Sequence, residues 1–162
     1  MSDAMRRFAD VVDLQSVTPA DFAPGADDVV AAGWVREPDG SVLARALRDS
    51  YAGSGFVDLT SREAAVNGRG VRDDDLPLDA PDRPQVLLRR AYSYATALLT
   101  RVAELPSPPE VTAFATLSLS ATEPPYWESH VTFWSAHEGE APYYDVDSLP
   151  GDDAVLVLTT KG

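Results

Sequence analysis

The chain has 162 residues and is 44% hydrophobic, which is enough to form one hydrophobic core. It is too short for two domains of ordinary size, so we expect a single globular domain over 1–162. It holds 26 acidic residues against 13 lysines and arginines, and the formal charge of −13 repels phosphate backbones, argues against nucleic-acid binding and favours basic partners. The absence of cysteine excludes disulfides, thiolate metal sites and cysteine nucleophiles.

The compartment is predicted from what the sequence lacks. It shows no basic-then-apolar leader, and no apolar run reaches the length of about 18 residues that a membrane span requires. We therefore expect a cytoplasmic protein with no membrane partner. The acidity also has an explanation that needs no partner, namely codon bias or a high-salt cytoplasm, because Lys161 is the only lysine and isoleucine is absent. Both explanations stay open at this point.

Short helices are predicted at the N-terminal end. Apolar residues recur at three- and four-residue spacing over 2–14, the pattern of an amphipathic helix, and Ser2 or Asp3 is suited to cap it. A second short helix is expected over 27–32, with acidic residues in its first turn and Gly33 as its terminator.

A β-hairpin is predicted next, with strands at 34–37 and 41–46. The turn between them is Pro38–Asp39–Gly40. Proline fixes φ, aspartate tolerates the turn and glycine supplies a left-handed position, so each turn residue has a physical reason to be there. A loop of small residues is expected over 49–55.

Thr60 and Glu63 stand at capping-box spacing and predict a helix over 61–66. Asn67–Gly68 then either ends this helix or forms a hairpin turn, and the two alanines in the segment favour the helix. Residues 68–84 are predicted to be a long acidic, proline-rich loop, because their prolines are incompatible with an internal helix.

The principal helix is predicted over 85–105, where Asp82 and Gln85 have capping-box spacing and the prolines after 105 stop it. A stripe of apolar residues recurs at helical period and should face the sheet. Its members are Leu87, Ala91, Tyr94, Leu98, Val102 and Leu105. Off this stripe lie Arg89, Arg90 and Arg101, which are expected either to be solvated or to meet the acidic loop.

Two alternating runs at 111–120 and 127–135 predict a long β-hairpin with one apolar face. Pairing must bring like faces together, so only even register sums are allowed. A turn centred on Pro124 places Leu117 opposite Val131 and Phe114 opposite Trp134, although a slip of two residues would keep the same faces. By the same register, Ala115 pairs with Phe133 and Ser118 with His130.

Two further strands are expected at 142–146 and 154–160. The second is apolar on both parities, which is typical of a strand buried on both faces. The elements together predict an α+β fold: a C-terminal antiparallel meander of about four strands and an N-terminal hairpin, packed against a long central helix and short N-terminal helices.

The histidines are the first candidates for a chemical site. His130 and His137 lie near several carboxylates in sequence, but their odd separation puts them on opposite faces of a continuous strand, and no metal-binding spacing occurs. We therefore predict no metal and no cofactor. Asp145 with Asp147, and Glu138 with Glu140, have the spacing of paired carboxylates, which arises readily by chance in so acidic a chain.

Aromatic residues provide the second candidate. They are dense in the C-terminal half: Phe114, Tyr126, Trp127, Trp134, Tyr143 and Tyr144. Phe114, Trp134 and His130 share the polar face of the predicted hairpin, which is therefore covered either by another layer of the protein or by a partner. Aromatic rings ringed by acids are suited to bind a basic protein, whereas ordinary core packing is the competing interpretation.

The leading hypothesis is a non-enzymatic cytosolic interaction protein that binds a more basic protein, as acidic inhibitors, immunity proteins and secretion chaperones do. Its predicted binding residues are Phe114, Trp134, His130, Glu128 and Tyr126. Two alternatives remain. One is a small enzyme or ligand-binding domain that uses the sheet face around His130, and the other is a structural subunit of a larger assembly that pairs through an exposed edge strand.

Overall fold

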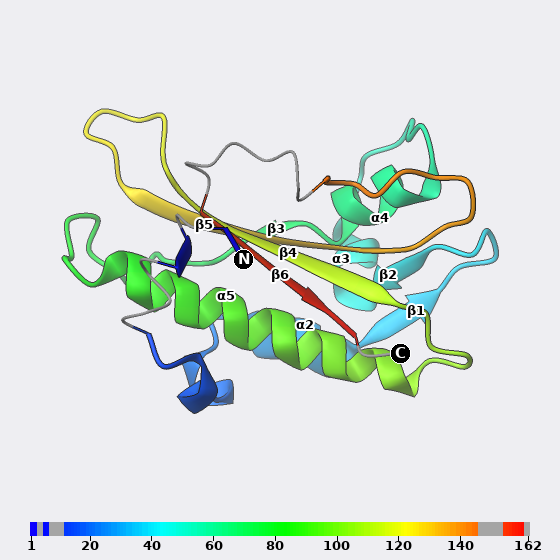
Figure 1. The fold of residues 1–162 in the computed structure, drawn as a ribbon, viewed down its shortest axis with the longest axis horizontal. Coiled ribbons are helices and arrows are strands. Elements are labelled where there is room, and N and C mark those ends of the chain that lie inside the picture. The colour runs from blue at the N-terminus through cyan, green and yellow to red at the C-terminus, as the bar shows by residue number, and fades with distance from the viewer. Residues whose placement is uncertain (3–4, 7–11, 146–153, 161–162) are drawn as a thin grey trace.

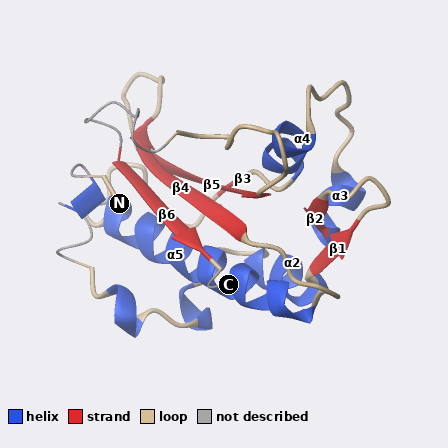
Figure 2. Cartoon of the chain, turned by 45° about the vertical axis from the view of Figure 1, so that its right-hand side comes forward, coloured by secondary structure: helices blue, strands red, loops and turns tan. Residues whose placement is uncertain are grey.

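The computed structural model describes residues 1–2, 5–6, 12–145 and 154–160, and it shows helices packed against a four-stranded antiparallel sheet. The long helix α5, Arg83–Thr100, runs along one face of this sheet, with α2, Ala26–Ala32, packed against it (Figure 1). On the opposite face lies α4, Leu59–Val66, and a separate two-stranded hairpin lies at one end (Figure 2). The predicted α+β class is confirmed.

The sheet has the strand order β3-β5-β4-β6. Its strands are β3, Arg69–Gly70; β4, Val111–Leu119; β5, Trp127–Ser135; and β6, Ala154–Thr159. In a meander β6 would pair with β5, whereas here it pairs with β4 on the other side of the hairpin. The fourth strand comes from the start of the predicted acidic loop. No strand forms over 142–145, and Val146 lies outside the described residues.

The register of the β4–β5 hairpin differs from the prediction by two residues. Val131 pairs with Ala115 rather than Leu117, and Phe114 pairs with Thr132 rather than Trp134. The reason lies in the turn: the Tyr126 carbonyl accepts the Ser120 N–H at 2.8 Å, which centres the loop on Glu123 instead of Pro124. Because the slip is even, every side chain keeps its predicted face.

Helix α5 continues into a short 3-10 turn, η3, Arg101–Glu104, so the predicted span of 85–105 is nearly correct. All six residues of the predicted apolar stripe are buried. The predicted capping box is not formed, because the helix begins at Arg83 and the Asp82 side chain makes no cap hydrogen bond. Pro84 occupies the first turn, where its missing N–H has no helical partner to lose.

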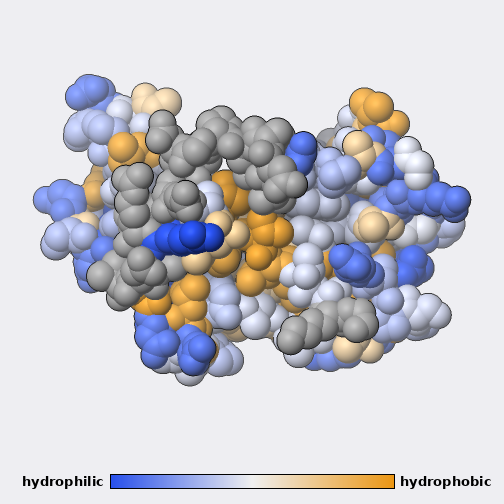
Figure 3. All heavy atoms as spheres, viewed as in Figure 1, coloured by the Kyte–Doolittle hydropathy of each residue, from blue (hydrophilic) through white to orange (hydrophobic). Residues whose placement is uncertain are grey.

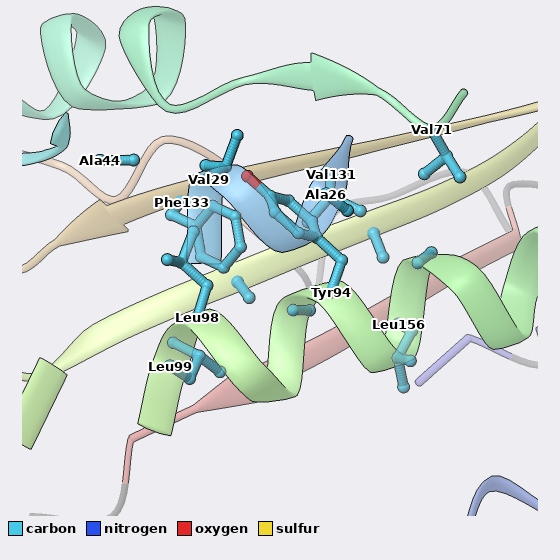
Figure 4. Close-up of a cluster of buried hydrophobic side chains, with 14 of the residues drawn as sticks. Ala26, Val29, Ala44, Val71, Tyr94, Leu98, Leu99, Val131, Phe133 and Leu156 are labelled. Atoms are coloured by element: carbon cyan, nitrogen blue, oxygen red, sulfur yellow. The ribbon is translucent and has the colours of Figure 1, made fainter. Parts of the chain in front are cut away.

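The core lies between α5 and the sheet. Phe133, which is fully buried, meets the rings of Trp34 and Tyr94 edge-on at centroid distances of 5.6 and 5.7 Å. Figure 4 shows Tyr94 and Leu98 rising from α5 towards Phe133 and Val131 on β5, with Leu156 of β6 beside the same helix. Alternate residues of each strand supply this face, as the sequence pattern predicted.

Arginines fasten the acidic loop to α5, as expected for Arg90. Its guanidinium donates to Asp75 at 2.8 Å and to the Arg72 carbonyl at 2.9 Å. Arg83 is 1% exposed, forms an ion pair with Asp73 and donates to the Trp127 carbonyl at 2.8 Å. The two other arginines predicted to lie off the apolar stripe, Arg89 in α5 and Arg101 in η3, pair with Asp21 and Glu104.

The N-terminal elements agree with the sequence in part, because the predicted helix 2–14 does not extend to its expected end: Val12 and Asp13 are not helical and Leu14 begins a 3-10 turn. Met5 and Arg6 are helical, and the Ser2 hydroxyl accepts the Met5 N–H at 3.2 Å, while most of the predicted helix 2–14 lies outside the described residues. Two 3-10 turns follow, η1, Leu14–Ser16, and η2, Pro19–Asp21. Gly33 ends α2 at φ 64°, a left-handed position that favours glycine.

The predicted N-terminal hairpin is confirmed, with β1, Trp34–Arg36, paired to β2, Val42–Ala44. Its second strand is shorter than predicted, because the chain turns at Arg45 into a helix, α3, Arg45–Ser50, that the sequence did not suggest. The Arg45 N–H donates to the Gly33 carbonyl at 2.9 Å, which extends the β1–β2 pairing to the first residue of α3.

The predicted helix at 61–66 is α4, and Asn67 ends it rather than opening a hairpin turn. Its cap was predicted wrongly. Asp58 is the N-cap and accepts the Ser61 N–H at 2.7 Å, whereas Glu63 is fully buried and binds elsewhere. The Asn67 amide bridges two sheets instead: it accepts the Ala44 N–H at 2.8 Å and donates to the Phe133 carbonyl at 3.2 Å.

Candidate functional site

The face of the sheet opposite α5, which we call the outer face, carries four of the five binding residues predicted from sequence. Phe114 on β4 and Glu128, His130 and Trp134 on β5 share it, because strand residues of one parity point the same way and the register is even. The fifth residue, Tyr126, precedes β5 and is half-buried. Its ring lies 5.3 Å from the Arg83 guanidinium, at the hairpin end of the sheet.

Phe114 and Trp134 are buried, at 3% and 5% exposure, so neither ring is available to a partner in this structure. Their centroids are 6.1 Å apart, and with Val155 they form a second apolar cluster. The segment after β5 covers them: Tyr144 stacks on Phe114 at 4.4 Å and an interplanar angle of 7°, and Tyr143 lies 5.8 Å from Trp134. The protein itself therefore provides the layer over this face.

Tyr143 and Tyr144 are the accessible rings of the outer face, with exposures of 44% and 40%. They meet each other edge-on at 5.0 Å. Sequence reasoning included both in the aromatic-rich set but assigned them to a strand. In the structure both rings pack against the cluster and stay partly exposed. This arrangement depends on a chain path outside any regular element, which periodicity cannot reveal.

A hollow of about 160 Å³ opens beside Tyr144 on the same face. Phe114 and Val155 give it an apolar floor, and Thr116 and Ser118 supply hydroxyl groups; Leu117 and Ala154 complete the described lining. Its volume matches one amino-acid side chain rather than a drug-sized ligand, for which pockets start at about 300 Å³.

His130 is an exposed residue on β5, directly opposite Thr116. Its pKa lies below the ordinary histidine value because the surrounding protein withdraws part of the ring from water, an effect that the nearby Glu128 carboxylate opposes. His130 lines neither the hollow beside Tyr144 nor the smaller one beside Tyr94.

A cluster that sequence reasoning missed surrounds Glu63. One carboxylate oxygen, Oε1, accepts the Val42 N–H, the Ser135 hydroxyl at 2.9 Å and His137 Nε2 at 3.0 Å, while Oε2 accepts the Ser135 N–H. The buried carboxylate thus connects α4 with β2 and β5. Only its position after Thr60 drew attention to it in the sequence, and that signal pointed to a helix cap.

The geometry of this cluster argues against a catalytic triad. In a triad, the acid orients one ring nitrogen of histidine while the other nitrogen contacts the nucleophile. Here Glu63 and Ser135 both contact Nε2 of His137, at 3.0 and 3.3 Å. Ser135 is 2% exposed, so its hydroxyl is closed to substrate, and the arrangement is suited to joining elements rather than to chemistry.

Charge is distributed unevenly along the chain. Residues 102–160, which include β4, β5 and β6, carry ten acidic side chains and no lysine or arginine. Glu128 and Glu138 are exposed and have no ion pair among the described residues. Glu140 instead accepts the Leu59 and Thr60 N–H groups at 3.1 and 2.8 Å at the start of α4, and the Thr60 N–H is the main reason that the pKa of Glu140 lies below its ordinary value.

Within the described ranges, no group of three or more histidine, aspartate or glutamate side chains is placed to hold a metal ion. Across those same ranges, no helix has the length and apolar character needed to cross a membrane. The predicted carboxylate pair of Asp145 and Asp147 is not testable, since Asp147 lies outside them. Comparison of the whole chain with known protein families, with curated proteins and with solved structures gave no match.

Proposed function

We propose that the chain is a non-enzymatic protein-interaction domain that binds an extended basic segment of a partner protein along β6 and the outer face. The observation that carries this proposal is the run of 59 residues between Arg101 and Lys161 without a basic side chain, which includes three of the four strands of the main sheet. Such a one-signed surface attracts basic partners and raises their association rate.

The edge strand β6 supplies backbone groups for such a segment. On its outer side, the Ser2 N–H donates to the Val155 carbonyl at 2.9 Å, and by strand alternation the backbone groups of Val157 and Thr159 point the same way. These two residues have no hydrogen-bond partner on that side among the described residues. A partner strand would extend the sheet there, as edge strands commonly do.

Side-chain recognition would come from the hollow beside Tyr144. Figure 3 shows a band of apolar atoms across the middle of the face on which β6 lies nearest the viewer. The hollow adjoins β6 through Val155, and its volume of about 160 Å³ suits one aliphatic or aromatic side chain of an added strand. A segment that alternates basic and apolar residues fits both the charge and the hollow.

The test uses a fluorescein-labelled peptide of alternating arginine and valine, and fluorescence anisotropy is the readout. A peptide of alternating glutamate and valine is the control of opposite charge. We expect binding of the basic peptide that weakens by about tenfold or more between 50 and 300 mM NaCl, because surface charges are screened. Thr159→Pro removes one outward N–H from an edge strand that tolerates proline, and should weaken binding by about fivefold.

The matched control compares charge removal in the two halves of the chain. Glu128→Gln with Glu138→Gln should weaken binding, whereas Asp28→Asn with Asp79→Asn, also exposed but in the arginine-containing half, should change it little. If the two double variants weaken peptide binding equally, the attraction is non-specific and the proposed site is wrong. A chain that forms dimers by light scattering and loses them in Thr159→Pro would assign the edge to a second copy instead, and would overturn the proposal.

A further inference from the structure

A second, smaller hollow lies on the α5 side of the sheet, at the opposite edge from β6. It is bordered by β3, α5 and the start of α2, and its described lining includes three arginines, Arg69, Arg72 and Arg90, together with Tyr94. Its volume of about 10 Å³ is near the smallest that holds a single water-sized particle.

The Tyr94 hydroxyl is the first unusual feature. It is one of three fully buried side-chain polar atoms among the described residues that have no hydrogen-bond partner. Figure 4 shows the ring rising from α5 with its oxygen turned away from the helix, towards α2 and the sheet. Burial raises the pKa of Tyr94 to about 12, although the charge of Arg69 and the approach of its guanidinium to the phenol oxygen both act in the opposite direction, so the hydroxyl keeps its proton and can donate it.

Arg69 is the second unusual feature. Its backbone pairs with Val131, which directs its side chain to the α5 face, and its guanidinium lies 5.5 Å from the Tyr94 ring centroid. The side chain is half-buried and has no ion pair among the described residues. The two neighbouring arginines do have carboxylate partners: Arg72 binds Asp74 and Arg90 binds Asp75. One positive charge in this group is therefore left over.

The side chains that carry polar groups into this hollow are all donors. Guanidinium groups and a protonated phenol have hydrogens to give, and guanidinium has no acceptor site. A water molecule could accept from Tyr94 and Arg69, but each of its own hydrogens would then need an acceptor, for which this lining offers only the phenol oxygen and backbone carbonyls. An anion accepts on every side, and a half-buried unpaired cation favours its presence.

From this geometry we propose that the hollow binds a monatomic anion of chloride size, held by the Arg69 guanidinium and by a hydrogen bond from the Tyr94 hydroxyl. The hollow is too small for phosphate. A chloride ion is larger than a water molecule, so its entry requires the exposed side chain of Arg72 to move outwards. The bound anion would join β3 to α5 and supply the missing negative charge. This site is independent of the surface proposed for partner binding.

The test measures thermal unfolding of the full chain in sodium chloride and in sodium gluconate at equal ionic strength. An anion that binds only the folded state raises the midpoint, and at about ten times its Kd the rise is about 2–5 °C for a chain of this length. Broadening of the chloride NMR line by the wild-type protein provides a direct binding signal that does not depend on unfolding.

Two pairs of variants assign the signal to the site. Tyr94→Phe and Arg69→Met should each abolish the chloride-specific rise and the line broadening, whereas Tyr92→Phe and Arg36→Met, on the same helix and on the exposed hairpin, should retain both. The effect of Tyr94→Phe on stability should also depend on the salt. It should destabilise the protein in chloride but not in gluconate, because a buried hydroxyl without a partner can be removed without loss.

Equal unfolding midpoints in chloride and gluconate for the wild-type chain, without line broadening, would overturn the proposal in favour of a bound water. A chloride effect of the same size in Tyr94→Phe would also overturn it, since the halide would then bind elsewhere. If Arg69→Met does not fold, as judged by circular dichroism, the paired Tyr94→Phe and Tyr92→Phe measurements decide the question alone.

Discussion

The two faces of the four-stranded sheet are closed by different means. On the α5 face, a continuous set of aliphatic and aromatic side chains fills the space, with Leu87, Leu98, Val131 and Phe133 fully buried. On the outer face, α4 is held largely by single polar side chains, and, among the described residues, two half-exposed tyrosine rings pack over Phe114 and Trp134. The α5 face is an ordinary hydrophobic core. The outer face is held by separate polar contacts and a small aromatic cluster, with accessible surface between them.

The polar fastenings of α4 come from both partners. Glu63 reaches β2 and β5, and Asn67 accepts the Ala44 N–H and donates to the carbonyls of Val42 and Phe133. In return, the Thr132 hydroxyl donates to the Ala64 carbonyl at 2.5 Å. Hydrogen bonds of this kind fix position and register sharply, while they contribute less net free energy each than the burial of a large apolar side chain.

The largest expected loss of stability comes from a substitution in the core on the α5 face. Phe133→Ala removes a ring that is fully buried between Trp34 and Tyr94, and should lower the free energy of unfolding by about 3–5 kcal/mol through lost burial and a cavity. Phe114→Ala, on the outer face, should cost at least about 1 kcal/mol less, because its site borders an open hollow that can relax or hydrate. Urea denaturation of both variants measures the difference.

Equal losses in the two alanine variants would show that the outer cluster is as tightly packed as the core, and the contrast between the faces would be wrong. A change in the slope of the urea transition in one variant alone would point to a partly unfolded state, and the comparison would then rest on milder substitutions, Phe133→Leu and Phe114→Leu.

The second effect removes a fastening of α4. In Glu63→Gln, one acceptor oxygen becomes an NH₂ group that faces backbone or hydroxyl donors from Val42 and Ser135, so we expect a loss of about 2–3 kcal/mol. The exposed Glu138→Gln serves as the control and should change stability by less than about 0.5 kcal/mol. Thermal and chemical unfolding should both rank Glu63→Gln as less stable than Glu138→Gln. If Glu63→Gln leaves the free energy of unfolding unchanged, α4 is held by packing alone.

This contrast also explains which parts of the structure could be predicted from the sequence. The stripe from Leu87 to Leu105 and the alternation of β4 and β5 repeat over many residues, so the sequence identified α5, the hairpin and the buried face of each. Glu63, Asn67 and Thr132 act singly across long sequence separations, and no period marks them. The same reasoning misread Glu63 as part of a cap, because its local spacing fits a helix start as well as its actual contacts.

The candidate surface was predictable to a similar degree. Alternation alone placed Phe114, Glu128, His130 and Trp134 on one face, and the structure brings them there. Whether that face was covered depended on the path of the chain after β5, and Tyr143 and Tyr144 follow no regular element. The two-residue error in register had the same origin, since the loop is closed by Ser120 and Tyr126 rather than centred on its prolines.

The smallest expected effect is a pH dependence of stability that distinguishes the two faces of the sheet. The contacts between α5 and the sheet are mainly apolar and do not titrate, whereas Glu140 accepts N–H groups at the start of α4 most strongly as an ionised carboxylate. Hydrogen bonds from Thr60, and burial in the opposite sense, leave the pKa of Glu140 below its ordinary value of 4.5. Its stabilising contribution is therefore complete above that value and is lost as the pH falls through the lower pKa of the folded state.

Glu140→Gln resembles the protonated acid, so its unfolding midpoint should lie below that of the wild type at pH 7, and the gap should close between about pH 5 and pH 3. Glu138→Gln should show no gap that varies with pH. Asp58 at the same helix start also has a lowered pKa, caused chiefly by the Ser61 hydroxyl, so some acid sensitivity should persist in the Glu140 variant. A gap that stays constant from pH 7 to pH 3 would mean that Glu140 contributes by shape rather than by charge, and the fastenings of α4 would then be less sensitive to acid than the hydrogen bonds indicate.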